Sequence, residues 1–586
     1  MQNAEPIDSI SRPIPMSFIV LTAAVVHLPL LMMELPLKSY DTNFHIFFAS
    51  HYLHHWFDPW NPKWFGGFSQ TTYPPLPQQW TAVLSHLFGL DMAYMAVQFI
   101  AIVLLGVGVY RFASIWVDAR AASYAAVLGI LLGSESFLVY NAGQLGTTSA
   151  APLYLLALPY LYEFLVRGGF RTWLKAIVLF AAAAAAHHAT LIFGSFFFAL
   201  PILFLAFRDH REDESSNAGI VFRAVLMTVC VIVVAGAILL PFWIALFKYP
   251  ITQTPIPHAS RANFILSPGW GLNYFIIPYG ALVLALPFII WRGAVTPRLR
   301  PLMIGFWVCF LVGLGGTTPV AHWLLRRAFE VLTFERFTYW ATLLALPIVG
   351  LLCADLVGRF RLRAAVPLGL LAALSCAGSV AWSAFRPTDN LPFSVDPVAM
   401  WLNRGGHDNY RYIVLGFGNK LSRLAMETDA TSVDGEWYSE RRLPELTKYG
   451  GGSLNAAKYF GKGGLSALRA ILEHADRYGL KWVFVRDPYY DPLLEFAGFR
   501  QVDELNNGEI TIWSRDGVPP ATPVFSTAQM PPHWQGLMWG TLPFGSSILA
   551  ILVVLLIPDP RRREEYDDTS IAPISEETVM PGRMVS

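Results

Sequence analysis

The sequence predicts a mainly α-helical protein that crosses a membrane many times and carries a small extracytoplasmic α/β domain. The chain has 586 residues, of which 54% are hydrophobic and only 14% are charged. Soluble proteins carry about 25% charged residues, so this composition excludes an ordinary soluble enzyme. About twelve segments are long and apolar enough to cross a hydrocarbon layer of ~30 Å, and a long polar stretch interrupts them near the C-terminal end.

Each expected span is a run of mostly apolar residues, close to the length of about 20 that a membrane helix needs. The runs are 16–36, 93–110, 121–140, 147–165, 173–187, 189–207, 222–246, 272–291, 302–320, 337–356, 364–384 and 535–557. The fifth and sixth runs are short and meet at His187 and His188. This pair forms either a helical hairpin or a single bent segment.

Basic residues between the spans indicate which ends are cytoplasmic, because Lys and Arg collect in short cytoplasmic loops. When the N-terminus is placed inside, every even-numbered gap between spans is basic. Arg111, Arg167, Arg298 and Arg361 are examples, and Arg561 follows the last span. This rhythm favours twelve spans over eleven or thirteen. We therefore expect a multi-pass protein of the inner (plasma) membrane whose two ends are both cytoplasmic.

The polar stretches divide the chain into four expected parts. Residues 1–384 form a membrane core with a large outer loop at 37–92. The three remaining parts are an extracytoplasmic α/β domain at 385–534, a last membrane helix at 535–557 and a disordered cytoplasmic tail at 558–586.

The α/β prediction for 385–534 rests on three strand-like runs and one helical pattern. The runs at 411–415, 481–486 and 509–513 are rich in residues that favour strands. A helical pattern at 465–478 lies between the first two. This alternation favours a small α/β unit.

Charge and cysteine usage exclude several functions. The 42 basic and 41 acidic residues give a net charge of +1, which provides no bulk attraction for nucleic acid. All four cysteines lie in apolar runs, without the spacing of a zinc site or a disulfide framework. A glycine-rich stretch at 450–464 lacks the spacing of a phosphate-binding loop, so we expect no nucleotide cofactor.

The first outer loop holds the residues best suited to chemistry. Asp41 and His45 lie four apart, so they face the same way if Asp41 begins a helix. A carboxylate and an imidazole would then meet at the membrane surface. The aromatic residues that follow are typical of an amphipathic helix at the headgroup level. The alternative is that Asp41 only caps a helix and that the aromatic residues form an interfacial belt.

Three motifs in this loop resemble a family of multi-spanning membrane proteins. They are DTNFH at 41–45, PWNPKWFGG at 59–67 and YPPL at 73–76. Together they resemble the family labelled 6-pyruvoyl-tetrahydropterin synthase-related, which is similar to the GT-C class of glycosyltransferases. Enzymes of that class take sugars from polyprenyl-phosphate carriers, and an acidic residue in their first outer loop is essential. The resemblance assigns that role to Asp41.

The resemblance implies transfer of a sugar from a polyprenyl-phosphate-linked donor to a glycan, lipid or protein acceptor outside the membrane. Such a donor carries its own leaving group, so transfer needs a base for the acceptor and positive charge for the departing phosphate. Asp41 is the expected base or metal ligand, and His45 would orient it, bind phosphate or complete a metal site.

A divalent cation, Mg²⁺ or Mn²⁺, would need a second carboxylate, for which Glu135 is the best candidate. Glu135 lies between two serines, which is not the double-acidic pattern often found in the second outer loop of the GT-C class. This departure leaves metal dependence open.

Phosphate recognition is expected from arginines on the outer side, because the planar guanidinium fits phosphate oxygens. The candidates near outer ends of spans are Arg261, Arg326, Arg327 and Arg336. Arg336 is the first choice, at the start of the tenth span. The alternative is that Arg336 only pairs with a neighbouring glutamate, Glu335 or Glu330.

Trp64 and Tyr73 are the expected aromatic contacts of the substrate. Two other functions stay open beside the transferase. One is a transporter or flippase for a lipid-linked glycan, whose polar groups would lie near the middle of the bilayer. The other is a non-catalytic protein with a GT-C-like fold. Polar residues here cluster at the outer ends of the spans, which favours chemistry at the membrane surface.

Overall fold

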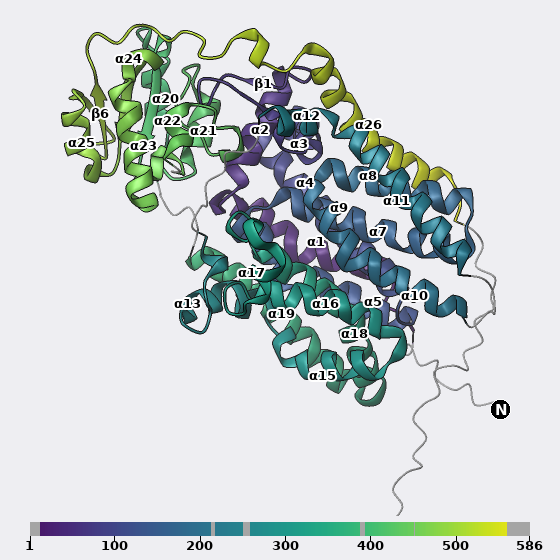
Figure 1. The fold of residues 1–586 in the computed structure, drawn as a ribbon. Coiled ribbons are helices and arrows are strands. Elements are labelled where there is room, and N and C mark those ends of the chain that lie inside the picture. The colour runs from purple at the N-terminus through teal and green to yellow at the C-terminus, as the bar shows by residue number, and fades with distance from the viewer. Residues whose placement is uncertain (1–11, 212–216, 250–257, 387–392, 450–451, 560–586) are drawn as a thin grey trace, which may run out of the picture.

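The computed structural model describes residues 12–211, 217–249, 258–386, 393–449 and 452–559. Helices make up most of the protein, and a small sheet lies at one end of it (Figure 1). Helix α26 (His533–Leu556) runs from the sheet region along the edge of the helical part. Most of the expected tail, residues 560–586, lies outside the described residues.

Most of the helices before the sheet region are joined by short connections, whereas the loop at 55–75 is longer. Their bounds are α1 (Met16–Met32), α2 (Thr42–His54), α3 (Leu76–Phe88), α4 (Leu90–Ala113), α5 (Ala119–Ile130), α6 (Gly133–Phe137), α7 (Leu145–Arg167), α8 (Phe170–Ala186), α9 (His188–Gly194), α10 (Leu200–Arg211), α11 (Ala218–Ile238), α12 (Leu240–Lys248), α13 (Pro268–Gly271), α14 (Ile277–Tyr279), α15 (Leu282–Val295), α16 (Arg300–Gly313), α17 (Val320–Leu325), α18 (Glu335–Phe360) and α19 (Leu362–Phe385).

Eight helical stretches among the described residues are long and apolar enough to cross a membrane. They are Leu90–Ala113, Ala119–Ala142, Leu145–Arg167, His188–His210, Ala218–Ile238, Glu335–Phe360, Leu362–Phe385 and Thr527–Leu556. The pair Pro268–Tyr279 and Leu282–Val295 is bent by 67° and would be a ninth span if it crosses as one.

The prediction of twelve crossings is therefore not confirmed, although helices occupy all of the expected positions. Helices α1 and α8 have 17 residues each, and α16 has 14. At 1.5 Å per residue, a helix of that length spans about 26 Å or less, which is short of the ~30 Å hydrocarbon layer. The fourth expected span that is missing from the eight is the bent pair, Pro268–Tyr279 with Leu282–Val295.

The junction between the fifth and sixth expected spans is a single residue. Helix α8 ends at Ala186 and α9 begins at His188, and His187 between them has an extended backbone. The buried alanines at 181–186 have small side chains, which lets α8 pack closely against α7 and α26.

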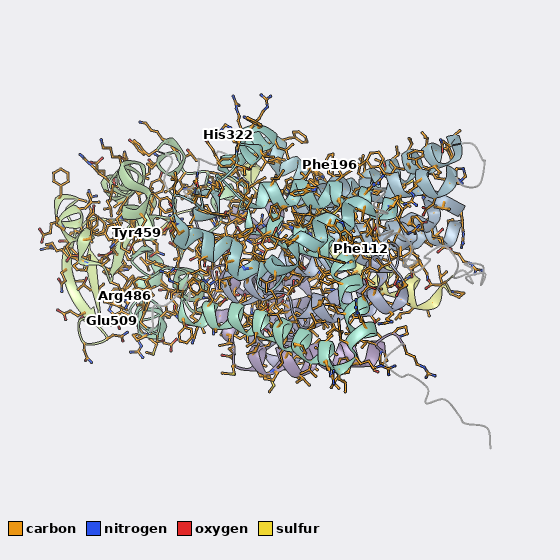
Figure 2. All side chains as sticks on the ribbon, turned by 90° about the horizontal axis from the view of Figure 1, so that it is seen from below. Phe112, Phe196, His322, Tyr459, Arg486 and Glu509 are labelled. Atoms are coloured by element: carbon orange, nitrogen blue, oxygen red, sulfur yellow. The ribbon has the colours of Figure 1, made fainter. Side chains whose placement is uncertain are left out.

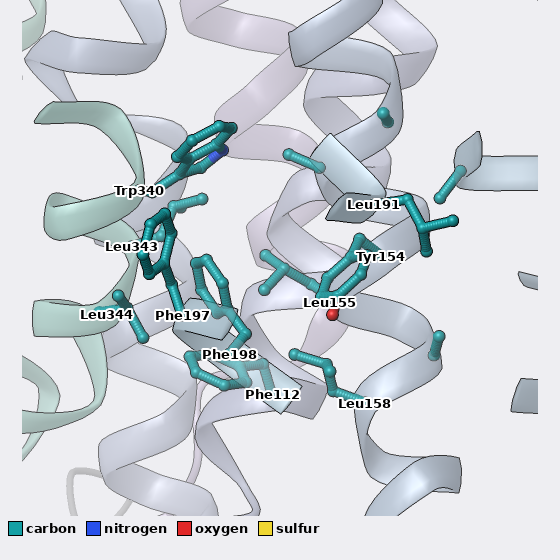
Figure 3. Close-up of a cluster of buried hydrophobic side chains, with 14 of the residues drawn as sticks. Phe112, Tyr154, Leu155, Leu158, Leu191, Phe197, Phe198, Trp340, Leu343 and Leu344 are labelled. Atoms are coloured by element: carbon teal, nitrogen blue, oxygen red, sulfur yellow. The ribbon is translucent and has the colours of Figure 1, made fainter. Parts of the chain in front are cut away.

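Side chains of the helical part divide into a buried core and an apolar outer surface. Phe112 is fully buried, whereas Phe196 is 62% exposed on a membrane-length stretch (Figure 2). Inside, Trp340 of α18 and Phe198 pack toward Tyr154 of α7 (Figure 3). Exposed apolar side chains on such long helices are typical of contact with lipid.

The sheet region follows α19 and contains a four-stranded sheet in the order β3-β4-β6-β5. The strands are β3 (Arg411–Leu415), β4 (Leu480–Val485), β5 (Arg500–Leu505) and β6 (Ile510–Ser514). Strands β3 and β4 are parallel, and the other pairs are antiparallel. The helices are α20 (Asp396–Leu402), α21 (Lys420–Glu427), α22 (Pro444–Lys448), α23 (Gly461–Glu473), α24 (Ala475–Tyr478) and α25 (Asp491–Phe496).

The strands expected at 411–415, 481–486 and 509–513 correspond to β3, β4 and β6 within one residue. The sequence did not predict β5. This strand lies at the edge of the sheet, and all but its last residue are exposed. Its sequence, RQVDEL, has apolar residues only at Val502 and Leu505 and lacks the alternation by which a half-buried strand is recognised.

The first outer loop and the sheet region share one hydrophobic core. Phe44 and Phe47 of α2 pack with Trp64 and Phe68, and the same cluster includes Val433 of the sheet region. A short two-stranded ladder, β1 (Trp60–Asn61) with β2 (Phe68–Ser69), shapes the loop. Helix α2 is thus buried along most of its length, without the exposed apolar face of the amphipathic helix that we expected.

Candidate functional site

Asp41 is held at the start of α2 by backbone contacts with the C-terminal end of the membrane-length stretch Ala119–Ala142. The Tyr40 and Asp41 amides donate to the Asn141 and Ala142 carbonyls at 3.1 and 3.0 Å. Gly143 follows with a φ of +71°, and a Cβ there would lie 2.3 Å from the Ser39 hydroxyl oxygen. Only glycine allows this close approach.

Asp41 is the N-cap residue of α2, yet its carboxylate does not cap the helix. A capping carboxylate accepts a hydrogen bond from an amide in the first turn. The Asp41 carboxylate accepts none from any residue that the structure describes, although its carbonyl accepts from the His45 amide at 3.1 Å. The alternative of a purely structural cap is therefore disfavoured.

Burial gives the Asp41 carboxyl an unusual acidity. The side chain is half-buried, and desolvation raises its pKa from 3.8 to about 7. The positive charge of Arg336 opposes this rise, and the negative charge of Glu335 adds to it. A carboxyl of this acidity exchanges its proton near neutral pH, as a general base requires.

His45 points its ring at a glutamine that a double proline positions. With the Gln78 amide oriented to satisfy its neighbours, His45 Nδ1 donates to Gln78 Oε1 at 2.8 Å, and the amide nitrogen donates to the Pro75 and Pro74 carbonyls. Burial and Arg336 lower the pKa of His45 to about 3. His45 is therefore neutral, with its lone pair on Nε2.

Arg336 is fixed by one nitrogen while its other nitrogens stay available. Its Nε donates to Gln144 Oε1 at 2.8 Å, and Gln144 Nε2 donates to Glu335 Oε1 at 2.6 Å. Gln144 thus separates Glu335 from Arg336, which forms no ion pair within the described ranges. The two Nη groups have no partner there, so their charge is free to meet an anion.

The two expected aromatic contacts occupy different environments. Tyr73 is half-buried, its ring centroid lies 5.5 Å from that of His45, and burial raises the pKa of its phenol, which stays neutral. Trp437 of the sheet region packs edge-on to Tyr73 at 5.1 Å, and its Nε1 donates to Thr72 Oγ1 at 2.9 Å. Trp64 is fully buried against Phe47, which is the position of a core side chain.

The other expected arginines lie in two different places. Arg261 donates through Nε to the Leu332 carbonyl at 2.9 Å, just before α18. Ser260 beside it accepts from the Phe334 amide, so this loop supports the start of α18 near Arg336. Arg326 and Arg327 are exposed on the segment after α17, next to His322 at the rim of the molecule (Figure 2).

The expected metal ligands do not form a metal site in the described part of the chain. Glu135 is fully buried in α6, and neither of its carboxylate oxygens has a hydrogen-bond partner among the described residues. The charged neighbours of Asp41 are Arg336 and Glu335 instead. Within the described ranges, no three His, Cys, Asp or Glu side chains are grouped to hold a metal ion.

The sequence did not indicate Gln78 or Gln144 as site residues, and it did not indicate that Glu335 accepts a hydrogen bond from Gln144. Gln78 follows the double proline at 74–75, and Gln144 follows Gly143, so both lie beside backbone turns. The turns were visible in the sequence. The partners of each amide were not, because they come from distant segments.

No family model matches the chain, and no curated protein matches it in sequence. The resemblance to the 6-pyruvoyl-tetrahydropterin synthase-related family therefore stays a prediction. Among solved structures, a variant of the arabinofuranosyltransferase AftD from mycobacteria has a TM-score of 0.51 and 15% identity. That match covers 86% of this chain and 42% of AftD, so the chain spans about two fifths of the length of its AftD matches.

ArnT from Cupriavidus metallidurans in the apo state has a TM-score of 0.50 and 12% identity, over 85% of this chain and 98% of ArnT. ArnT has also been solved bound to undecaprenyl phosphate, with a TM-score of 0.49 and 13% identity over 87% of this chain and 100% of ArnT. These neighbours are GT-C glycosyltransferases, and at such identities the similarity concerns the fold alone. The chain is a multi-pass membrane protein with a fold similar to theirs.

Proposed function

We propose that this protein is a membrane glycosyltransferase. It transfers a sugar from a polyprenyl-phosphate-linked donor to a hydroxyl group of an extracytoplasmic glycan, lipid or protein. The observation that carries the proposal is the pairing of a free carboxylate with a free guanidinium. Asp41 accepts no hydrogen bond from the described residues and has a pKa raised to about 7, and the charge that most opposes this rise is Arg336.

The proposed reaction uses these two groups in one displacement. Asp41 takes the proton of the acceptor hydroxyl, and the acceptor oxygen bonds to the anomeric carbon of the sugar. The bond between that carbon and the phosphate oxygen breaks, and the phosphate leaves with the bonding electrons. The Nη groups of Arg336 stabilise its negative charge, because Gln144 already fixes the guanidinium through Nε.

The neighbouring groups would orient the reactants. His45 is neutral with Nε2 unprotonated, so Nε2 can accept a hydrogen bond from a sugar or acceptor hydroxyl. Tyr73 and Trp437 offer aromatic surface beside it, which suits the apolar face of a pyranose. Undecaprenyl phosphate bound to ArnT is the reason for naming a polyprenyl carrier. Since Glu135 and Asp41 supply no metal cluster within the described ranges, the reaction proposed here routes no step through a cation.

The arrangement of the basic residues supports the proposed orientation in the inner membrane, with cytoplasmic termini and the sheet region at 385–534 outside. Asp559, after α26, accepts from Lys175 Nζ at 2.5 Å and lies 3.6 Å from Arg111. Arg298 donates to the Ile115 carbonyl at 2.7 Å. These residues belong to gaps expected on the inner side, whereas Asp41 belongs to the outer loop. We also propose the four parts expected from the sequence: a membrane core at 1–384, an extracytoplasmic domain at 385–534, a last membrane helix at 535–557 and a cytoplasmic tail at 558–586.

Purified protein in proteoliposomes with a polyprenyl-phosphate sugar tests the proposal, with products identified by mass spectrometry. We expect wild type to form a new glycosidic bond and Asp41→Asn to form none. Asp58→Asn is the matched control in the same loop, because Asp58 is exposed and its carboxylate accepts, among the described residues, only from the nearby Trp60 amide. Movement of the donor across the vesicle membrane without a new bond would favour the flippase. An active Asp41→Asn protein would remove the base from the proposal.

A further inference from the structure

One helix of the sheet region is fastened to the membrane part directly beside Asp41. Helix α21 packs against α2, and Arg423 donates both Nη groups to the Asp91 carboxylate at 2.7 and 2.9 Å. Asp91 lies in the first turn of α4. This two-bond ion pair fixes the orientation of α21, because a planar guanidinium and a carboxylate match in geometry.

Asn419 stands at the N-terminal end of α21, in the loop that follows β3. An asparagine at a helix N-cap usually accepts a hydrogen bond from the first turn. Asn419 makes no such cap bond among the described residues. Its Nδ2 donates to the Ser39 carbonyl at 2.8 Å and lies 3.5 Å from the Tyr40 carbonyl. The Asn419 side chain therefore binds the outer loop and leaves the first turn of α21 without a side-chain cap.

The bonded carbonyls belong to the peptide units that immediately precede Asp41. The other side of the same segment is held by the Asn141 and Ala142 carbonyls, which accept from the Tyr40 and Asp41 amides. Asn419 thus completes a clamp on the backbone from the sheet region. The two faces of the segment are gripped by elements that are about 280 residues apart in sequence.

We propose that Asn419 is a positioning residue for Asp41, through which the sheet region sets the place of the catalytic carboxylate. The proposal rests on the base role of Asp41 given above. Rate depends steeply on such placement, since an error of about 1 Å in an aligned group costs on the order of 100-fold. Loss of the Asn419 bond should therefore lower kcat and leave donor binding at Arg336 intact.

The test compares Asn419→Leu and Asn419→Asp with Asn403→Leu. Leu and Asp keep the approximate size of Asn419 and remove its donor. Asn403 is the matched control, because its Nδ2 donates to the Glu427 carbonyl at the opposite end of α21. Substitutions at Asn419 and at Asn403 therefore each remove a hydrogen bond at one end of α21. Only the Asn419 substitutions also remove the hydrogen bond to the segment before Asp41. Thermal unfolding and size-exclusion profiles identify variants that fail to fold.

We expect both Asn419 variants to lower kcat about tenfold or more, with the donor KM changed about twofold or less, and Asn403→Leu to keep kcat near wild type. Hydrogen exchange supplies a readout that needs no activity. The Tyr40 and Asp41 amides should exchange faster in the Asn419 variants only. Equal effects of Asn403→Leu and Asn419→Leu on kcat and exchange would overturn the proposal. If wild type is inactive but the amides exchange as expected, the proposed transferase function is refuted, whereas the proposal that Asn419 holds the segment before Asp41 is supported.

Discussion

Replacing Asp41 by Asn should abolish sugar transfer and at the same time make the protein more stable above neutral pH. Burial raises the pKa of this carboxyl from 3.8 to about 7, so the folded state resists its ionisation. Between these values the folded state binds the proton more tightly than the unfolded chain does. Folding stability therefore falls as pH rises through this window. The Asp41→Asn variant escapes this cost, because an amide cannot ionise.

The size of the effect follows from the two pKa values. Linkage gives a cost for the wild-type carboxyl of about 1.7 kcal/mol at pH 5 and about 4.3 kcal/mol at pH 8. The advantage of Asp41→Asn over wild type should therefore grow by about 2.6 kcal/mol between these pH values, which moves a melting temperature by a few degrees. The change with pH is the useful quantity, because the difference in packing between Asn and a neutral Asp is the same at both pH values.

Melting temperatures of wild type, Asp41→Asn and the exposed control Asp58→Asn, measured in detergent from pH 5 to pH 8, give the comparison. We expect the Asp41→Asn curve to separate upward from wild type as pH rises, and the Asp58→Asn curve to follow wild type. An Asp41→Asn protein that is less stable than wild type by a constant amount at every pH would show that the carboxylate supports the fold. That result would refute the argument that burial raises the pKa of Asp41 and prepares its carboxylate to act as a base.

The rate of transfer should rise about tenfold from pH 6 to pH 8 as Asp41, with its pKa of about 7, loses its proton, and a flat profile in initial-rate assays would contradict its role as base. Arg336→Gln should raise the donor KM about tenfold or more, since it removes charge-assisted hydrogen bonds to phosphate, whereas exposed Arg326→Gln should change it about twofold or less in the same titration. Chelation with EDTA should change the rate about twofold or less, because the proposed reaction stabilises the phosphate charge with the Nη groups of Arg336; a loss that Mn²⁺ restores would point to a cation.

The sequence could indicate Asp41, His45 and Arg336, because spacing along a helix and position near the end of a span are local properties. It could not indicate that Gln144 lies between Glu335 and Arg336. That contact joins residues 191 and 192 positions apart, and an amide carries no periodic signal. The same limit applies to Gln78, whose role depends on the fold of the loop around it.

The aromatic loop shows a different limit of sequence reasoning. The aromatic residues of the first outer loop were expected at the headgroup level, where aromatic residues are common, and Trp64 among them was expected to contact the substrate. In the structure the sheet region covers them, and Trp64 is fully buried. A core of aromatic residues and an interfacial belt have the same composition and similar spacing. Only the tertiary contact with Val433 and its neighbours distinguishes them.

The contact with the sheet region also bears on the proposed role of Asp41 as a base. A carboxylate in open water has a pKa near 4 and would be a weak base at neutral pH. Asp41 lies where the membrane part, through Arg336, meets the sheet region, through Asn419 and Trp437. In the proposed reaction, a lipid-linked donor would reach this seam from the bilayer and an acceptor would reach it from outside. The buried carboxyl, with its pKa raised to about 7, thus lies where the two proposed substrates would meet.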